Sequence, residues 1–426
     1  MHADRSPIFK FARMAKWMQI VRLEDTDRLP IWRRPMTLLF LMAVAMPVAF
    51  STWLALINNF VIEIASFGGA GIGWLHTVRE IPGFLAIGVI ALIIVIREQV
   101  LGLISLILLG MATAVTAQFP TMGGILTVTF LSSIGYHYYE TVNQSLQLQW
   151  IAKDRAPQVL GWLLSAGSAA TILCYVLIVL SWEALGLTYT AVYWISGGFT
   201  AVVGLICLFA YPQFEAPHPQ VKRMVLRRRY WLYYALQFMS GARRQIFIVF
   251  AGFMMVEQFS YSVDEITRLF LATLVMNMML APILGKLVGV FGERRALIVE
   301  YFGLCGVFFA YAGIYFFGWG VVLAATLYVV NHLFFSLALA IKTYFQKIAD
   351  PADIAPTAAV AFTINHIAAV FLPVMLGYLW LQSPGLVFVA ASVMAIVSLL
   401  LSFLIPRHPA PGHETVFQRR LLAAAE

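Results

Sequence analysis

The chain has 426 residues, of which 61% are hydrophobic and only 11% are charged. Soluble domains are about 45–50% apolar and about 25% charged, so this composition excludes a soluble globular protein and indicates an integral membrane protein. The 28 Lys and Arg residues exceed the 20 Asp and Glu residues and give a formal net charge of +8. In a membrane protein such an excess reports the orientation of loops, so it does not indicate nucleic-acid binding.

The first segment, residues 1–34, is basic and has no secretory signal pattern, because no apolar core is followed there by a small-residue cleavage site. Its stretch IFKFARMAKWMQIVRL places Phe11 and Met18 on one helical face, with Lys10 and Lys16 mostly on another. This pattern is typical of a basic helix that lies on the cytoplasmic lipid surface. A basic tail without fixed structure is the alternative.

Long apolar runs fill most of the remaining chain and alternate with short polar breaks. A hydrocarbon core about 30 Å thick requires about 20 helical residues to cross, and no backbone group in it can go unpaired. We therefore expect an all-α integral membrane protein with about twelve transmembrane helices. The runs are 36–62, 72–96, 100–117, 122–148, 158–182, 188–211, 231–257, 264–290, 296–316, 319–343, 356–380 and 384–405.

Positive charge is concentrated in every second break between these runs. The breaks QFPTM (118–122) and LQSPG (381–385) carry no Lys or Arg, whereas Arg97, Lys153 and Lys347 lie in the alternate breaks. The positive-inside rule therefore predicts that both termini are cytoplasmic. We expect the membrane to be a bacterial inner membrane.

A long polar interval, residues 212–230, divides the runs into two halves, and its second half is rich in Lys and Arg. A solvated linker with no further meaning is the alternative interpretation. Similar sequences, QWIAKDRAP (149–157) and QKIADPADIAP (346–356), end the fourth and tenth runs. Two six-helix bundles related by pseudo-two-fold symmetry are the layout of one class of transporters. The expected domains are a basic cytoplasmic segment (1–34), an N-terminal half (35–211), a basic cytoplasmic linker (212–230), a C-terminal half (231–405) and a cytoplasmic tail (406–426).

The segment after the eighth run, GKLVGVFGERRAL (Gly285–Leu297), resembles the cytoplasmic signature of the major facilitator superfamily, Gly-x-Leu-x-Asp-x-x-Gly-Arg-Arg. Glu293 is inserted before the arginine pair, and Gly289 stands at the Asp position. The resemblance implies a secondary transporter that works by alternating access, with the signature near the cytoplasmic gate. The gating candidates in this segment are Gly285, Arg294 and Arg295. Ordinary anchoring by positive charge is the alternative for the two arginines.

The seventh run contains two adjacent arginines, Arg243 and Arg244, about a dozen residues from its start and therefore near mid-membrane. Charges at that depth are costly and are usually turned inward and paired. Consecutive helical residues point about 100° apart, so one arginine can face the central cavity while the other pairs with a neighbouring helix. A cavity arginine would bind a carboxylate or phosphate through a bidentate fork. A purely structural ion pair is the alternative.

The fourth run carries a polar stripe in which side chains recur every three or four residues. Its site candidates are Tyr136, His137 and Glu140. His137 and Glu140 lie one turn apart and could exchange a proton in a coupled transporter. A structural partnership between Glu140 and one of the arginines is the alternative.

Three further polar groups complete the candidates. Arg79 and Glu80 precede Pro82, which indicates a kinked gating segment; a shorter second span with both charges at the interface is the alternative. The pairs Asn331–His332 and Asn365–His366 lie in the tenth and eleventh runs and are substrate or coupling candidates. The histidines lack metal-ligand spacing, so we expect no metal site and no cofactor.

No Gly-rich phosphate loop, nucleophile elbow or zinc-protease motif occurs, and the loops are too short for a catalytic domain, so we do not expect an enzyme. The sequence predicts a secondary transporter of a small polar, anionic solute, driven by protons, embedded in lipid as a monomer. A proton-driven exporter of amphipathic compounds is the first alternative. A membrane receptor or scaffold is the second.

Overall fold

The computed structural model describes residues 19–85, 87–151, 156–215, 226–350 and 353–417. Most of the expected basic N-terminal helix, together with Lys153, therefore lies outside the described residues. The last part of that helix, Ile20–Arg22, is instead a short strand, β1. It pairs in parallel with β2, Gln213–Glu215, which begins the expected linker.

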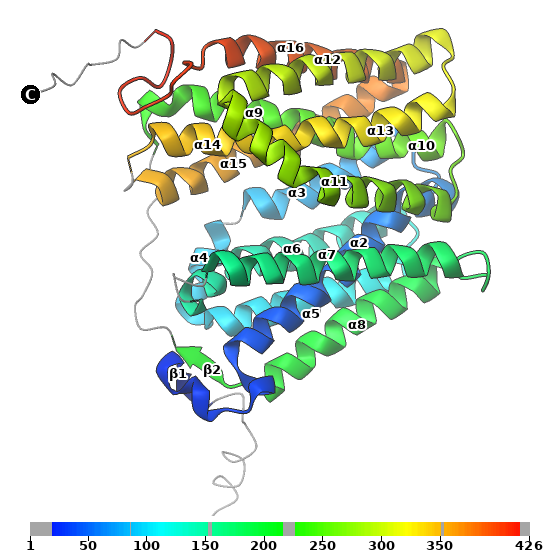
Figure 1. The fold of residues 1–426 in the computed structure, drawn as a ribbon. Coiled ribbons are helices and arrows are strands. Elements are labelled where there is room, and N and C mark those ends of the chain that lie inside the picture. The colour runs from blue at the N-terminus through cyan, green and yellow to red at the C-terminus, as the bar shows by residue number, and fades with distance from the viewer. Residues whose placement is uncertain (1–18, 86, 152–155, 216–225, 351–352, 418–426) are drawn as a thin grey trace, which may run out of the picture. The chain divides into compact units, whose positions relative to one another are not determined.

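The chain forms two compact units. The first comprises Met1–Ile57 and Leu85–Val221, and the second comprises Asn58–Phe84 and Lys222–Glu426. The first unit contains most of α2 (Pro35–Glu63), α4 (Ile87–Val95), α5 (Glu98–Val115), α6 (Met122–Trp150), α7 (Ala156–Ser181) and α8 (Tyr189–Ala210). The second contains α3 (Gly69–Phe84), α9 (Trp231–Ile246), α10 (Gly252–Glu257), α11 (Val263–Phe291), α12 (Glu293–Phe317), α13 (Val321–Phe335), α14 (Leu339–Ile348), α15 (Ile354–Gln382) and α16 (Pro384–Phe403) (Figure 1).

Helices dominate the described residues, and every predicted apolar run is helical where it is described. Among these residues, eight helical segments are long and apolar enough to cross a membrane. The four runs that fall outside this group are 72–96, 122–148, 231–257 and 264–290. Three of these exclusions have a visible reason. The run 72–96 is divided between α3 and α4, so neither helix is long enough. The run 122–148 forms α6, which carries a polar stripe, and the run 231–257 begins with α9, which carries two arginines.

Three of the predicted runs are interrupted helices. Helix α3 ends at Phe84, directly after Pro82 and Gly83, and α4 starts at Ile87. A π-helical segment, Phe247–Ala251, separates α9 from α10, and a 3₁₀ turn, Ser336–Ala338, separates α13 from α14. Such irregular turns frequently mark functional sites or hinges.

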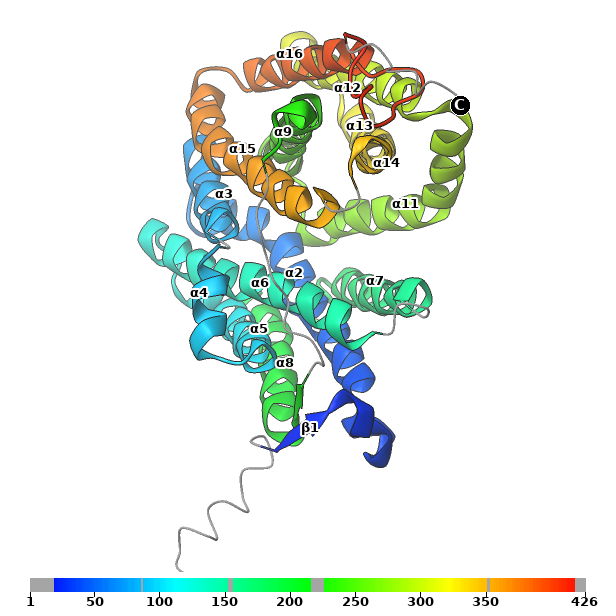
Figure 2. The same cartoon turned by 90° about the vertical axis from the view of Figure 1, so that its left-hand side faces the viewer.

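Glycines allow the closest helix contacts within each unit. In the first unit, α5 meets α8 where a Cβ added at Gly197 would lie 2.4 Å from the carbonyl oxygen of Gly110. In the second unit, a Cβ added at Gly73 of α3 would lie 2.4 Å from the carbonyl oxygen of Pro373 of α15. Figure 2 shows α3 lying along α15. Any side chain at these positions would force the backbones apart.

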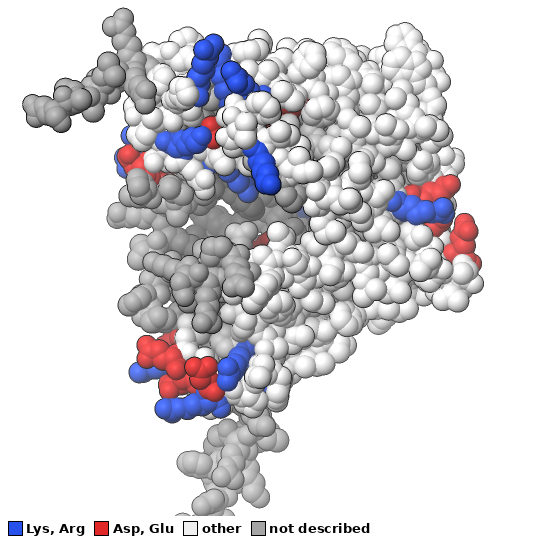
Figure 3. Space-filling view, in the orientation of Figure 1, with Lys and Arg blue, Asp and Glu red and all other residues white. Residues whose placement is uncertain are grey.

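The surface has the character of a membrane protein. Large apolar side chains on the flanks of the helices are exposed, including Leu164 of α7 (74%) and Phe302 of α12 (73%). On the face shown in Figure 3, most Lys, Arg, Asp and Glu side chains lie toward the ends of the helices, and most of the surface between them is uncharged. Exposed apolar surface on this scale is suited to contact with lipid.

Candidate functional site

The two adjacent arginines of α9 have different surroundings. The side chain of Arg243 is fully buried, with 0% exposure, and its Nη1 lies 3.7 Å from Oε1 of Glu300 on α12. Its Nε donates to the carbonyl oxygen of Met239, 3.2 Å away. The guanidinium carbon lies 4.3 Å from the centre of the Tyr301 ring, which is a cation–π distance. Arg243 is therefore enclosed within the helices of the second unit.

Arg244 is only partly buried and contacts α15. Its Nη2 donates to Oδ1 of Asn365 over 2.8 Å. The side-chain nitrogen of Asn365, Nδ2, donates in turn to the carbonyl oxygen of Gln237 over 3.2 Å. Gln237 lies one helical turn before Gly241. A Cβ added at Gly241 would lie 2.6 Å from the carbonyl oxygen of Asn365, so glycine lets α9 approach α15 closely here. This packing holds the Arg244 side chain in one orientation.

The tenth-run candidates lie on α13. Asn331 is fully buried, and neither polar atom of its amide has a hydrogen-bond partner among the described residues. His332 is partly buried; its Nδ1 lies 3.1 Å from the carbonyl oxygen of Tyr328. Its ring meets that of Phe247 edge-on, with centroids 4.9 Å apart. His332 is thus held by packing against the π-helical segment, which is the environment of a structural histidine.

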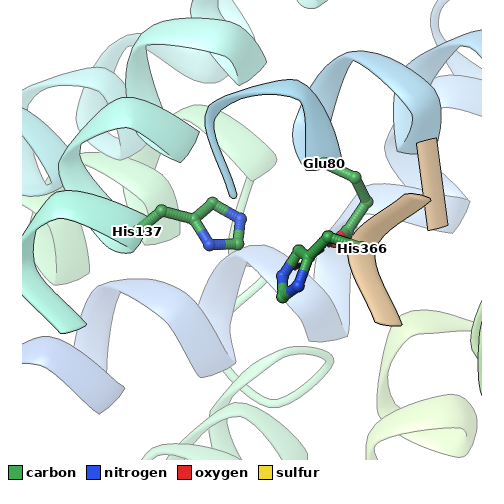
Figure 4. Close-up of side chains that lie close together, drawn as sticks. All are labelled: Glu80, His137 and His366. Carbon is green, nitrogen blue, oxygen red and sulfur yellow. Dashed lines mark ion pairs between the residues drawn. The ribbon is translucent and has the colours of Figure 1, made fainter. Parts of the chain in front are cut away.

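The gating candidates on α3 lie beside α15. Oε2 of Glu80 is 3.7 Å from Nε2 of His366, and both side chains are nearly buried (Figure 4). Oε1 of Glu80 is 2.5 Å from Nη2 of Arg79. Glu80 therefore has one cation on its own helix and one titratable partner on α15. His137, also labelled in Figure 4, belongs to α6 of the first unit.

The polar stripe of α6 is mixed in its burial. His137 is buried, whereas Glu140 is partly buried and Gln144 is exposed. The Tyr136 ring stacks on that of Phe50, with centroids 4.4 Å apart and an angle of 14°. The His137 ring meets that of Tyr136 edge-on at 5.1 Å. The aromatic stack fixes the Tyr136 side chain against α2 within the first unit.

The predicted signature segment forms the junction of two helices. Gly285 lies within α11, and Gly292 ends that helix with a φ of +81°, a conformation that glycine adopts without strain. The inserted Glu293 is buried, and its Oε1 pairs with Nζ of Lys347 at 2.7 Å. Arg294 is partly buried and Arg295 is exposed; neither makes an ion pair with another described residue.

The described end of the linker is tied to the segment before α15. Asp353 accepts hydrogen bonds from Arg227, Arg229 and Tyr230, and Arg229 also pairs with Asp350. The bonds from Arg227 are the main cause that lowers the pKa of the Asp353 carboxyl below its usual value of 3.8. We call Arg227, Arg229, Tyr230, Asp350 and Asp353 the linker clasp.

Glu300 is the functional-site candidate that the sequence analysis missed. It is the only charged residue in the run 296–316, and the expense of a charge at membrane depth is the signal that could have identified it. Its role as partner of Arg243 was not predictable, because the two residues lie on helices whose rotation the sequence does not give.

Comparison with known proteins agrees with this architecture. The sequence model described as Major Facilitator Superfamily matches residues 35–373. A mutant of the nucleoside transporter NupG has a similar structure, with a TM-score of 0.70 and 14% identity over 87% of this chain and 99% of that one. A bacterial homologue of the human lysosomal transporter Spinster, inward-facing and occupied, gives a TM-score of 0.67 and 14% identity over 87% and 95%.

A third similar structure is a bacterial homologue of the iron transporter ferroportin in an inward-facing state, with a TM-score of 0.66 and 14% identity over 88% of this chain and 100% of that one. No curated protein sequence matches the chain significantly. The family match covers most of the chain, and the structural matches show the same fold. The chain therefore belongs to the Major Facilitator Superfamily, as a multi-pass integral membrane protein that transports a small molecule and is not an enzyme.

Proposed function

We propose that the protein is a secondary active transporter that moves a small anionic solute by alternating access, with Arg244 as the residue that binds the anion. The supporting observation is that the two arginines differ in their burial and in their contacts. Arg243 already has a counter-ion, Glu300, and has no exposed surface. Arg244 is only partly buried, and its Nη2 hydrogen bond to Oδ1 of Asn365 orients the guanidinium.

The chemistry of a guanidinium defines the substrate class. A guanidinium presents several N–H donors in one plane and matches the two oxygens of a carboxylate or phosphate. With one Nη2 hydrogen bond made to Asn365, the group is already oriented before a ligand arrives. Such pre-orientation reduces the entropy lost on binding. The similar structures include a nucleoside transporter and a homologue of an iron transporter, so the shared fold itself favours no substrate class.

The proposal includes three further features that were expected from the sequence. Protons supply the energy, because several acidic side chains are buried within apolar helices, including Glu80 and Glu300. The protein resides in a bacterial inner membrane as a monomer. Its two termini lie in the cytoplasm, on the side that the basic loops face.

Thermal unfolding with and without added ligands tests the proposal. The purified full chain is heated with organic carboxylates, phosphate esters, metal cations or amphipathic drugs, since a ligand that prefers the folded state raises Tm. An anion that stabilises the wild type should fail to stabilise Arg244→Gln. The charge-matched control is Arg268→Gln, which removes one exposed arginine from the early turns of α11 and should keep the ligand-induced shift.

Two results would contradict the proposed substrate class. The first is stabilisation by amphipathic cations alone, unaffected by Arg244→Gln, which would favour an exporter of amphipathic compounds. The second is an anion that stabilises wild type and Arg244→Gln equally, which would remove Arg244 from the site.

A further inference from the structure

The ion pair between Arg243 and Glu300 is fully buried, and it is loosely made. The side chains of both residues are 0% exposed. The distance from Nη1 to Oε1, 3.7 Å, is too long for a hydrogen bond. Two such charges attract each other strongly in an apolar interior, yet in this conformation they do not reach contact distance.

Several polar atoms around the pair lack hydrogen bonds to other described residues. They are Nη1 and Nη2 of Arg243, both carboxylate oxygens of Glu300 and the hydroxyl of Tyr301. A buried polar group without a partner costs about 1–3 kcal/mol, and a charged group costs more. Burial of an ion pair is stabilising only when its geometry and hydrogen bonding are good. The cluster is therefore not explained as a structural support of the fold.

The surroundings leave Arg243 as the dominant charge acting on Glu300. The nearby titratable groups are Tyr301 and Cys305 on the same helix, and both also interact with Arg243. Helix α16, which packs extensively along α12, contributes no titratable side chain. The ionisable side chains on the other neighbouring helices are occupied elsewhere or exposed. His332 of α13 packs on Phe247, and Lys342 of α14 is exposed. Lys347 of α14 pairs with Glu293, and Asp264 of α11 pairs with Arg268.

Glu300 lies about two helical turns from the first residue of α12. It is seven residues after Glu293, the first residue of α12, which corresponds to about 10 Å along a helix. The predicted orientation places that end of α12 at the cytoplasmic surface. Both side chains are fully buried in the described conformation, so proton exchange between water and Glu300 requires the surrounding helices to move.

We propose that Glu300 is the residue that binds and releases the transported proton, and that Arg243 is the counter-charge that displaces it. A proton enters from water and bonds to a carboxylate oxygen of Glu300 when the guanidinium is withdrawn. When the guanidinium approaches, the ionised carboxylate is favoured, and the proton is released to water on the side that alternating access has then opened. The inference rests on the proposed proton coupling and names the residue that performs it.

Infrared difference spectroscopy of the full chain in lipid tests this assignment without knowledge of the substrate. Ordinary carboxylates, with pKa values near 4, remain ionised between about pH 9 and about pH 6. We expect the wild type to gain, over this range, a C=O stretching band from the protonated carboxylic acid of Glu300. Glu300→Gln should lose that band, and Glu183→Gln, which changes an exposed glutamate between α7 and α8, should retain it.

A second variant separates proton binding from a structural role. Arg243→Gln removes the counter-charge, so the protonated band should persist to a pH about one to three units higher than in the wild type. Tyr301→Phe, which removes a hydroxyl but no charge, should leave the titration unchanged. Should Glu300→Gln fail to fold, Glu300→Asp keeps a carboxyl group and should move the band and its titration.

The outcomes are decisive for Glu300 and separate from those for the anion site. Absence of the band in the wild type, its survival in Glu300→Gln, or no response to Arg243→Gln would overturn the assignment. Arg244→Gln should keep the band while losing anion-induced stabilisation. A protein that shows the band but binds no anion would refute the substrate class alone, and the reverse result would refute the proton site alone.

Discussion

The hydroxyl of Thr77 on α3 fills the backbone gap that Pro373 opens in α15. Thr77 Oγ1 donates to the carbonyl oxygen of Val370 over 2.8 Å and accepts from the amide of Val374 over 3.2 Å. Proline lacks an N–H and disturbs the preceding helical turn, so its neighbours need other partners. One side chain of α3 thus supplies both a donor and an acceptor to the interrupted helix, within the seam that Gly73 and Gly377 bring together.

Thr77→Val should destabilise the second unit. Valine has nearly the shape of threonine but cannot donate or accept, so two backbone groups of α15 would lose their partner in a buried seam. We expect a loss of about 1–3 kcal/mol in the free energy of unfolding, measured by denaturant or thermal unfolding of the purified protein. Thr77→Ser keeps the hydroxyl and should retain most of the stability. Equal stability of the valine and serine variants would contradict this role.

Gly73→Ala should separate α3 from α15. The new Cβ would lie 2.4 Å from a backbone carbonyl oxygen, which cannot turn aside as a flexible side chain can. Forcing extra volume into a packed contact costs about 1–3 kcal/mol. The matched control is Gly198→Ala on α8, where an added Cβ meets nothing within 4 Å. That control should equal or exceed the wild type in Tm, because alanine favours a helix over glycine.

The extent of the helices could be predicted from the sequence, since the hydropathy of a run depends on composition alone. The interruptions were only partly predictable. Pro82 and Gly83 indicate the end of α3, but nothing in the residues Phe247–Ala251 indicates a π-helical turn. Such a turn is a change of backbone register that tertiary packing decides.

The candidate site was predictable in its residue types and not in its pairings. Arg243 and Arg244 were identifiable as unusual from depth alone, but their 100° separation leaves open which one is enclosed. That choice depends on where Glu300 and Asn365 lie on two other helices. Glu300 is isolated in its run, so its sequence neighbours carry no information on its partner.

Asn365→Asp should abolish anion binding at Arg244. The aspartate would place a negative charge where Oδ1 of Asn365 now lies, 2.8 Å from Nη2 of Arg244, and this charge would compete with the substrate. A bound anion that raises Tm of the wild type should therefore produce no shift in the variant. His332→Gln, a change at a packed histidine of α13, is the control and should keep the shift. Retention of anion-induced stabilisation in Asn365→Asp would contradict the proposed role of Arg244.

Asp353→Asn should make the stability of the protein less dependent on pH in acid. The hydrogen bonds from Arg227 lower the pKa of Asp353 in the folded protein below its usual 3.8. A group with a lowered folded pKa stabilises the fold fully at pH values above its unfolded pKa, and this stabilisation is lost as the pH falls through the folded pKa. The linker clasp should therefore be intact at neutral pH and weaken only below about pH 4.

Thermal unfolding at a series of pH values measures this contribution. At neutral pH the wild type should have a higher Tm than Asp353→Asn, and the two values should converge as the pH falls below the ordinary pKa of aspartate. Because Arg227 is exposed, added salt should reduce the difference at neutral pH. The matched control is Asp25→Asn, which changes a partly exposed aspartate whose ion pair among the described residues is with exposed Arg28, at 3.6 Å. A constant difference in Tm between wild type and Asp353→Asn at every pH would show that the clasp does not act through the ionised carboxylate.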